Sequence, residues 1–145
     1  YNLGIAYKEM QLYDEAIEAF RLARKDPGRT LACANLMGLC FLAKGQAEAA
    51  IRELRAGLEV RGHPREAYQA LRYDLGAAYD TQGDLERALE VFDSLMAENE
   101  RFRDVRNRVK GLRERVQQQR AAAAVPVEAQ APPPPVKSKK KISFI

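Results

Sequence analysis

Histidine, cysteine and tryptophan are scarce in this sequence of 145 residues, which has one His, two Cys and no Trp. The single histidine, His63, lies between Gly62 and Pro64, a setting typical of a turn. We find no Cys/His metal-ligand spacing, no glycine-rich phosphate loop, and no serine or cysteine with a plausible base. These absences exclude the common catalytic and metal-binding arrangements. We therefore expect no enzyme, no metal site and no cofactor.

Long hydrophobic runs are also missing, because none approaches the roughly 20 residues that a membrane span needs. No signal peptide is visible, and Tyr1 lies within a helical pattern, so we expect a fragment whose first repeat is truncated at its start. Cys33 and Cys40 are about 10 Å apart along one predicted helix, which is too far for a disulfide. Two small buried thiols in a reducing compartment are favoured over a metal or redox pair. This predicts a cytoplasmic protein.

The net charge of +4 hides a partition along the chain. Residues 1–100 carry 12 basic and 17 acidic side chains, which gives −5. Residues 101–120 carry 8 basic and 2 acidic side chains (+6), and residues 121–145 carry 4 and 1 (+3), which completes the sum of +4. Any binding of nucleic acid or of an anionic membrane is therefore confined to the last 45 residues.

Small and large residues recur at a fixed spacing through residues 1–100. Gly4 is followed by Gly38 after 34 residues and by Gly76 after a further 38. The same intervals separate the alanines Ala16, Ala50 and Ala88, the rings Tyr7, Phe41 and Tyr79, and the large apolar residues Phe20, Leu54 and Phe92. This period predicts stacked helical hairpins. The glycine and the alanine would lie where the two helices cross closely, and the large residues would fill the space around the crossing.

This spacing resembles the tetratricopeptide repeat, whose 34-residue unit carries Leu-Gly, Tyr, Ala, Phe and Pro in this order. The resemblance covers three units over about residues 1–100 and implies an all-α, right-handed solenoid of antiparallel helix hairpins. The proline mark is Pro27 in the first unit, is displaced to Pro64 in the second and is absent from the third. Pro64 is predicted to begin an extended helix over residues 64–81, and Asp14, Thr30 and Asp84 are predicted helix N-caps.

Residues 101–120 are predicted to form a basic amphipathic cap helix. Its apolar stripe recurs at steps of three and four, at Phe102, Val105, Val109, Leu112 and Val116. Docking on the third hairpin is favoured over a free coiled coil or a DNA-reading helix, because solenoids need a cap over their last apolar face. Residues 121–145 are an Ala/Pro-rich linker and a basic tail, which we expect to be disordered.

The resemblance implies that a partner peptide or helix binds in a concave groove lined by the first helix of each hairpin. By helical phase, the residues that would face this groove are Tyr1, Ile5, Lys8, Asn35, Leu39, Leu42, Tyr73, Ala77 and Asp80. Asn35 could hydrogen-bond a peptide backbone, and Tyr1 and Tyr73 are aromatic anchors. Ordinary contacts between helices are an equally weighted alternative for each of these side chains.

Chaperone adaptors of this family grip a C-terminal carboxylate with lysine, arginine and asparagine on their first helices. Asn2 matches that pattern, but Leu36 replaces the second asparagine, and Ala70 and Asp74 replace the cations. We therefore expect a protein-interaction adaptor or scaffold that is not a chaperone-tail receptor. The alternative is a binder of nucleic acid or of an anionic membrane, acting through the basic helix and the lysine tail.

The chain ends in a basic cluster followed by alternating apolar residues: Lys139, Lys140, Lys141, Ile142, Ser143, Phe144 and Ile145. Alternation suits a short strand added to the edge of a partner's sheet, so we expect the tail to dock a second protein. Contact with an anionic membrane and a plain solvated tail remain open as alternatives.

Overall fold

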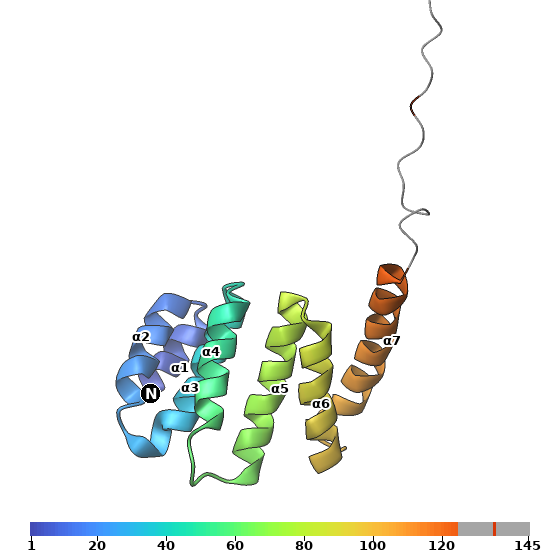
Figure 1. Ribbon diagram of the computed structural model, residues 1–145. Helices are drawn as coiled ribbons and strands as arrows, with labels where there is room; N and C mark the ends of the chain where they lie inside the picture. The colour runs from blue at the N-terminus through green and yellow to red at the C-terminus, as the bar shows by residue number, and fades with distance from the viewer. Residues whose placement is uncertain (125–134, 136–145) are drawn as a thin grey trace, which may run out of the picture.

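The computed structural model describes residues 1–124 and Pro135, and all regular structure in that part of the chain is helical. In chain order the elements are α1 (Asn2–Glu9), α2 (Tyr13–Ala23), the short 3-10 helix η1 (Pro27–Arg29), α3 (Thr30–Ala43), α4 (Ala47–Leu58), α5 (Arg65–Gln82), α6 (Leu85–Glu98) and α7 (Val105–Ala123). Each helix packs on the next from α1 to α7, and α3 also contacts α5. The helices thus form a row of hairpins, α1–α2, α3–α4 and α5–α6, with α7 at the end (Figure 1). The predicted all-α solenoid is confirmed.

The glycine of each hairpin lies where the second helix approaches most closely. A Cβ atom at Gly4, Gly38 or Gly76 would lie 2.6 Å from the side chain of Phe20, Leu54 or Phe92, respectively. Real Cβ atoms do not come this near, so each site requires glycine unless its neighbour shifts. The nearest atoms belong to the large residue rather than to the facing alanine, although Ala16, Ala50 and Ala88 are all fully buried. The large side chain therefore lies directly over the glycine.

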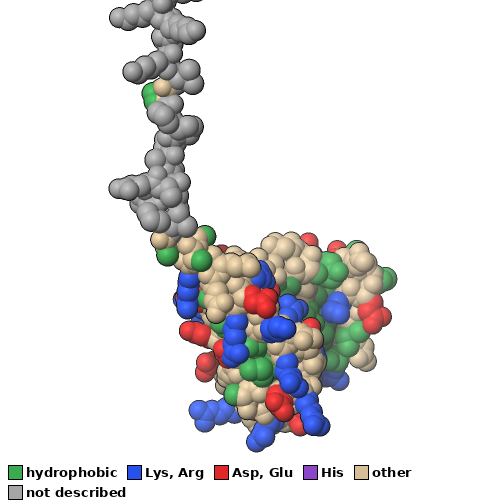
Figure 2. All heavy atoms as spheres, turned by 90° about the vertical axis from the view of Figure 1, so that its right-hand side faces the viewer, with side chains coloured by type: hydrophobic (Ala, Val, Ile, Leu, Met, Phe, Trp, Pro, Cys, Tyr) green, Lys and Arg blue, Asp and Glu red, His purple; other side chains and the backbone are tan. Residues whose placement is uncertain are grey.

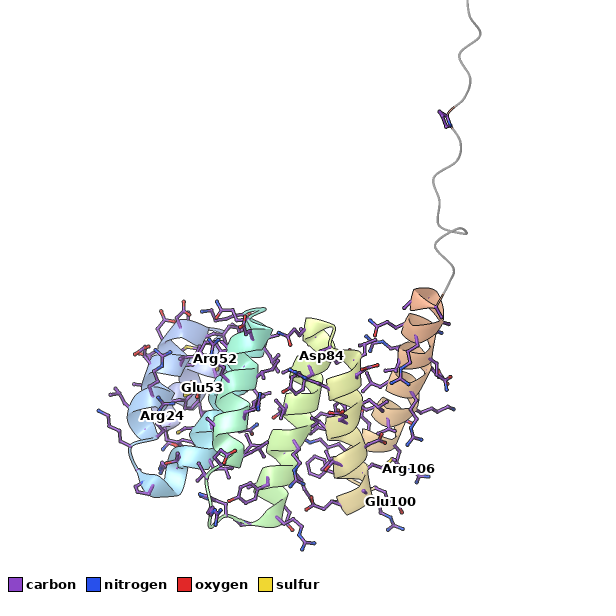
Figure 3. The ribbon with its side chains drawn as sticks, viewed as in Figure 1. Arg24, Arg52, Glu53, Asp84, Glu100 and Arg106 are labelled. Atoms are coloured by element: carbon purple, nitrogen blue, oxygen red, sulfur yellow. The ribbon has the colours of Figure 1, made fainter. Side chains whose placement is uncertain are left out.

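Of the three helix N-caps predicted from the sequence, only Asp84 is observed. Asp84 caps α6, where its Oδ1 accepts a hydrogen bond of 3.2 Å from the Arg87 backbone N–H, and it lies at the start of that helix in Figure 3. The predictions for Asp14 and Thr30 are wrong. The chain leaves α1 through Gln11 at a φ of +61°, so α2 starts at Tyr13 and Asp14 lies inside its first turn. Thr30 is already the first residue of α3.

The extended helix at the start of the third hairpin is confirmed within one residue, because α5 runs Arg65–Gln82. Pro64 is its N-cap rather than its first helical residue, with φ −60° and ψ 150°. Ahead of it, the Tyr68 hydroxyl donates a 2.6 Å hydrogen bond to the carbonyl of Val60. This bond ties the turn to the helix that follows.

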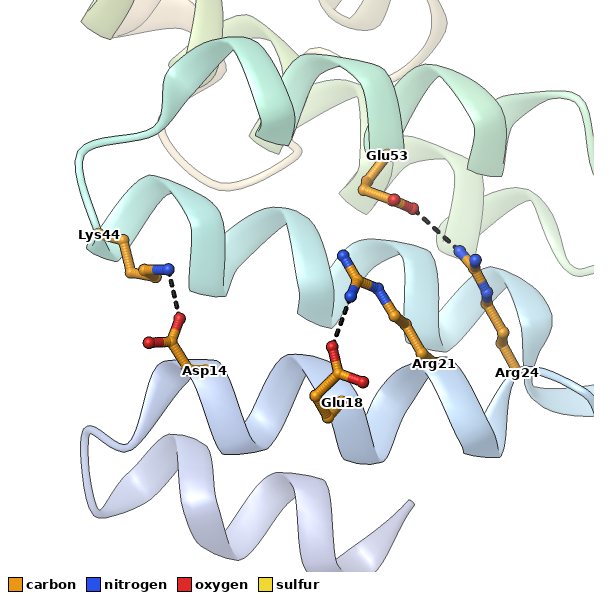
Figure 4. A network of polar contacts seen from close by, with 6 residues as sticks. All are labelled: Asp14, Glu18, Arg21, Arg24, Lys44 and Glu53. Carbon is orange, nitrogen blue, oxygen red and sulfur yellow. Dashed lines mark hydrogen bonds and ion pairs between the residues drawn. The ribbon is translucent and has the colours of Figure 1, made fainter.

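Polar side chains also join neighbouring helices. Arg24 at the end of α2 donates to Glu53 of α4 at 3.3 Å, and Lys44 at the end of α3 pairs with Asp14 of α2 (Figure 4). Arg24 and Glu53 are also marked in Figure 3. Exposed pairs of this kind each contribute about 0–1 kcal/mol, so the apolar core decides the stability.

The buried side-chain amide of Gln69 links α5 to the end of α6. Gln69 of α5 is 3% exposed, and its Nε2 donates to Glu98 of α6 at 3.2 Å while its Oε1 accepts from Asn99 at 3.2 Å. Arg72 also donates to Glu98. Burial acts to raise the pKa of Glu98, but the hydrogen bonds from Gln69 and Arg72 outweigh it and lower the pKa below its ordinary value. The carboxylate is thereby kept in its charged form.

The basic helix packs on the third hairpin by its apolar stripe. Val105, Val109, Leu112 and Val116 are buried and belong to the same core cluster as Phe92 of α6. The predicted bounds of 101–120 are wrong at both ends, because α7 is Val105–Ala123. Residues 101–104 form turns, with Arg103 at a φ of +46°, and the alanines after residue 120 continue the helix because alanine is the strongest helix former.

Both cysteines lie buried in α3 as free thiols. Burial raises the pKa of Cys33 and of Cys40, although nearby positive charges oppose the shift, so both thiols are kept protonated and unreactive. No helix among the described residues is long and apolar enough to cross a membrane. Within the same residues, no group of three or more His, Cys, Asp or Glu side chains could hold a metal ion.

The predicted tail site at Lys139, Lys140, Lys141, Ile142, Ser143, Phe144 and Ile145 lies outside the described residues.

Candidate interaction surface

The nine residues predicted to face a partner lie on α1, α3 and α5 or, for Tyr1, at the N-cap of α1. We call this side of the three helices the first-helix face. All nine side chains are neither fully buried nor fully exposed. Ile5, Leu42 and Ala77 pack partly against the core below them, whereas Leu39 belongs to neither core cluster. The face thus presents apolar surface that the fold itself does not fully use.

Tyr1 is fixed at one end of this face. Its ring meets Phe20 edge to face at a centroid distance of 6.2 Å. The guanidinium of Arg29 lies 4.4 Å above the same ring, within cation–π range. Tyr1 is therefore held by Phe20 of its own hairpin and by Arg29 of η1, which precedes α3.

Asn35 of the first-helix face contacts Asp74, a buried carboxyl group of α5. The Asn35 amide of α3 donates a 2.5 Å hydrogen bond to Asp74 Oδ2 of α5, which leaves the Asn35 carbonyl oxygen and one N–H for other partners. Arg103, in the turn before α7, lies 3.8 Å from the other Asp74 oxygen. Burial raises the pKa of Asp74 above its ordinary range, although the Asn35 hydrogen bond and the Arg103 charge both act to lower it. Asp74 is thus a buried carboxyl group that depends on two polar partners.

Tyr73 joins α5 to α7. Its hydroxyl donates to Asp104 and accepts from Arg108 Nε at 3.3 Å. Its ring packs edge to face on Phe92 with centroids 5.4 Å apart, and the Arg103 guanidinium lies 4.8 Å from the ring centre. Burial and the Asp104 hydrogen bond raise the pKa of this phenol. The Tyr73 hydroxyl therefore already donates one hydrogen bond and accepts one within the chain.

Asp80 is held from α7 in the same way. Arg115 Nη1 lies 2.8 Å from one of its oxygens and Arg108 Nη1 lies 3.6 Å from the other. The sequence pattern places Asp80 on the face but gives no hint of these partners. Arg108 and Arg115 are seven residues apart on one helix, which is the signal that could have placed them on a common side of α7.

The charges at this end of the face are layered. The carboxylates lie deeper, since the side chains of Asp74 and Asp80 are 9% and 17% exposed, whereas those of Arg103, Arg108 and Arg115 are 50%, 36% and 49% exposed. We call these three arginines the arginine row. Figure 2, which views the α7 end of the molecule, shows basic side chains with acidic ones among them.

A separate apolar hollow opens on the outer side of the first hairpin. It measures about 430 Å³ and its apolar lining includes Leu3, Tyr7 and Leu22. Met37 and Leu75 occupy the position of Leu3 in the second and third hairpins, where both are buried. The position of Leu3 is therefore apolar because, in the other two hairpins, the matching residue is part of the packing between hairpins.

Comparison with known proteins gives the same architecture. Residues 1–23 match the family model of the tetratricopeptide repeat. The TPR2AB domain of yeast Sti1, solved in a pHSP90 complex, superposes with a TM-score of 0.77 at 23% identity over 88% of this chain, which spans only 50% of the Sti1 chain. No curated protein matches the sequence.

Two further structures extend this likeness. The Sgt2 TPR domain from Aspergillus fumigatus has a TM-score of 0.68 at 15% identity over 97% of this chain and 85% of its own. The second TPR domain of human RPAP3, solved with an HSP70 peptide, has a TM-score of 0.65 at 14% identity over 76% of this chain and 88% of its own. The match at residues 1–23 and the superpositions thus show that this chain has the helical-hairpin fold of tetratricopeptide repeat domains.

Proposed function

We propose that this chain is a non-catalytic adaptor that binds a peptide or helix of a partner protein along the first-helix face. The observation that carries the proposal is the set of partly exposed apolar side chains Ile5, Leu39, Leu42 and Ala77 on α1, α3 and α5, the first helices of the three hairpins. Leu39 supports it most, because it packs in neither core cluster. A partner that covers such side chains removes apolar area from water, which is favourable by about 25 cal/mol per Å² before the costs of association.

Proteins of the same fold support a peptide as the partner, because Sti1 was solved with pHSP90 and RPAP3 with chaperone peptides. This chain lacks the full set of side chains that would hold a C-terminal carboxylate in their manner. Leu36 and Ala70 offer no charge or amide, and Asp74 would repel the carboxylate. The proposed partner is therefore an internal segment of a protein rather than a chaperone tail.

Four of the five α7 arginines are paired with carboxylates, which argues against nucleic acid as the main ligand. Arg108, Arg113, Arg115 and Arg120 each lie within ion-pair distance of a carboxylate on α5 or α6. Phosphates would have to compete with these carboxylates. Two buried free thiols suit a reducing compartment, so we place the adaptor in the cytoplasm and keep a second partner at the tail as part of the proposal.

Selection from a random 12-residue peptide phage library on the intact chain tests this function. We expect the enriched peptides to bind Leu39→Asp at least about tenfold more weakly than the wild type, a loss of about 1.4 kcal/mol. Leu22→Asp is the matched control, because Leu22 is exposed on α2 away from the first-helix face. It should bind as the wild type does.

Circular dichroism and the melting temperature must show that both variants fold. If no peptide is enriched, or if folded Leu39→Asp binds within twofold of the wild type, the first-helix face is not the binding surface.

A further inference from the structure

We propose that the outer side of the first hairpin is a second docking surface, which takes an amphipathic helix of a partner protein with a lysine or arginine opposite Glu15. The surface is the apolar hollow described above, and we call it the outer hollow. Its apolar lining is Leu3, Tyr7, Ala19 and Leu22. The inference goes beyond the proposed function, because the outer hollow shares no residue with the first-helix face.

The apolar residues that are exposed point to the first hairpin. Among the described residues, the exposed large hydrophobic side chains are Leu3, Met10, Leu12 and Leu22, and all belong to this hairpin. Leu22 lines the outer hollow and is 65% exposed. Its counterparts in the second and third hairpins are the small residues Ala56 and Ser94. The repeat pattern therefore does not explain why this position carries leucine, whereas contact with a partner would.

The third hairpin has the same hollow, and there a helix packs over it. Leu75 and Tyr79 occupy the positions of Leu3 and Tyr7. They line a hollow of about 310 Å³, to which α4 of the preceding hairpin adds Arg55. Leu75 is 5% exposed where α4 packs on α5, but Leu3 is 58% exposed. A helix that lies on α1 as α4 lies on α5 would therefore bury Leu3.

The charge at the outer hollow favours a basic helix. Asp14, Glu15 and Glu18 line it. Asp14 and Glu18 each pair with a cation of this chain (Figure 4), whereas Glu15 is in no ion pair within the described part of the chain. In the third hairpin Arg87 stands at the position of Glu15, in the hollow that Arg55 reaches. A helix with a cation at the position of Arg55 would thus meet a carboxylate in the first hairpin, where the third hairpin presents a like charge.

A second copy of this chain matches the outer hollow less well. In a twofold dimer the same surface meets itself, so the carboxylates of one copy would approach those of the other. The other end of the row is α7 (Figure 1), and the apolar stripe of α7 is already buried in the core. An amphipathic helix with a cation beside its stripe matches both the apolar lining and the free carboxylate.

Selection from a helix library tests the inference with the first-helix face disabled. The library keeps the apolar residues of α4 and randomises the positions between them, and the target is the folded Leu39→Asp chain. We expect lysine or arginine to be enriched at the position of Arg55. The enriched helices should bind the wild type and Leu39→Asp alike, and should bind Leu22→Asp at least about tenfold more weakly.

Two further variants test the charge. Glu15→Gln should weaken binding of the enriched helices about threefold, the effect of one exposed ion pair. Glu114→Gln, which removes an exposed carboxylate from α7, is the matched control and should change little. Circular dichroism must show that every variant folds.

The other outcomes overturn the inference while the first-helix face stands. No enrichment, or full binding by Leu22→Asp, means that the outer hollow is not a docking surface. Neutral or acidic residues at the position of Arg55, with full binding by Glu15→Gln, overturn the basic helix. A dimer in sedimentation equilibrium that Leu22→Asp dissociates assigns the hollow to a second copy. Helix binding that is at least about tenfold tighter to a chain ending at Ala124 assigns it to residues 125–145.

Discussion

A chain that ends at Asn99 should melt well below a chain that ends at Ala124, or should aggregate. The missing segment carries Val105, Val109, Leu112 and Val116, each at most 3% exposed. Burial of one such side chain contributes about 1.5–3 kcal/mol. Part of this gain is offset by the entropy of ordering α7, so we expect a net loss of several kcal/mol. The shift in melting temperature should then exceed about 5 °C.

The chain that ends at Ala124 is the right reference because it keeps all seven α-helices. Differential scanning calorimetry of both chains at equal concentration gives the comparison. Equal melting temperatures would mean that α7 adds nothing to the third hairpin, and its role as a cap would be wrong.

Replacement of Gly76 by leucine should destabilise the protein by about 1–3 kcal/mol, the usual effect of overpacking a core. Even a Cβ atom at this position would lie 2.6 Å from the Phe92 ring, and Phe92 is fully buried. The ring cannot move without displacing other core side chains. Urea denaturation followed by circular dichroism measures the change.

Gly111 offers a matched control, because it lies inside α7 and no atom lies within 4 Å of the Cβ that alanine would add there. Gly111→Ala should stabilise the chain by up to about 1 kcal/mol through helix propensity alone. Combining Gly76→Leu with Phe92→Leu should restore part of the lost stability, since the shorter side chain makes room. A stable Gly76→Leu variant would contradict the close crossing of α5 and α6.

The hairpins can be predicted from sequence because their marks are local and periodic. Gly4, Gly38 and Gly76 are each followed by a large apolar residue 16 positions later, and the structure places that residue over the glycine in every hairpin. Helix starts are harder to predict. Asp14 has the chemistry of an N-cap, but the backbone at Gln11 decides where α2 begins. Cap chemistry alone does not fix such a boundary.

The polar part of the candidate site could not be predicted in the same way. Tyr73 reaches Asp104 across 31 residues and Arg108 across 35, so no local pattern relates them. Helical phase places Tyr73 and Asp80 on the first-helix face, but only the packing of α7 brings arginines to them. The apolar stripe of α7 predicts which side of the helix is buried. It does not predict which residues the arginines on the other sides of α7 contact.

Mapping of backbone amide shifts tests directly whether a partner binds along the first-helix face. The ¹⁵N-labelled chain is titrated with an unlabelled peptide taken from the library selection, and the shift of each assigned amide is followed. We expect the shift changes to gather on α1, α3 and α5 around Ile5, Leu39 and Ala77. Changes confined to the outer sides of α2, α4 and α6, with the first-helix face unmoved, would contradict it.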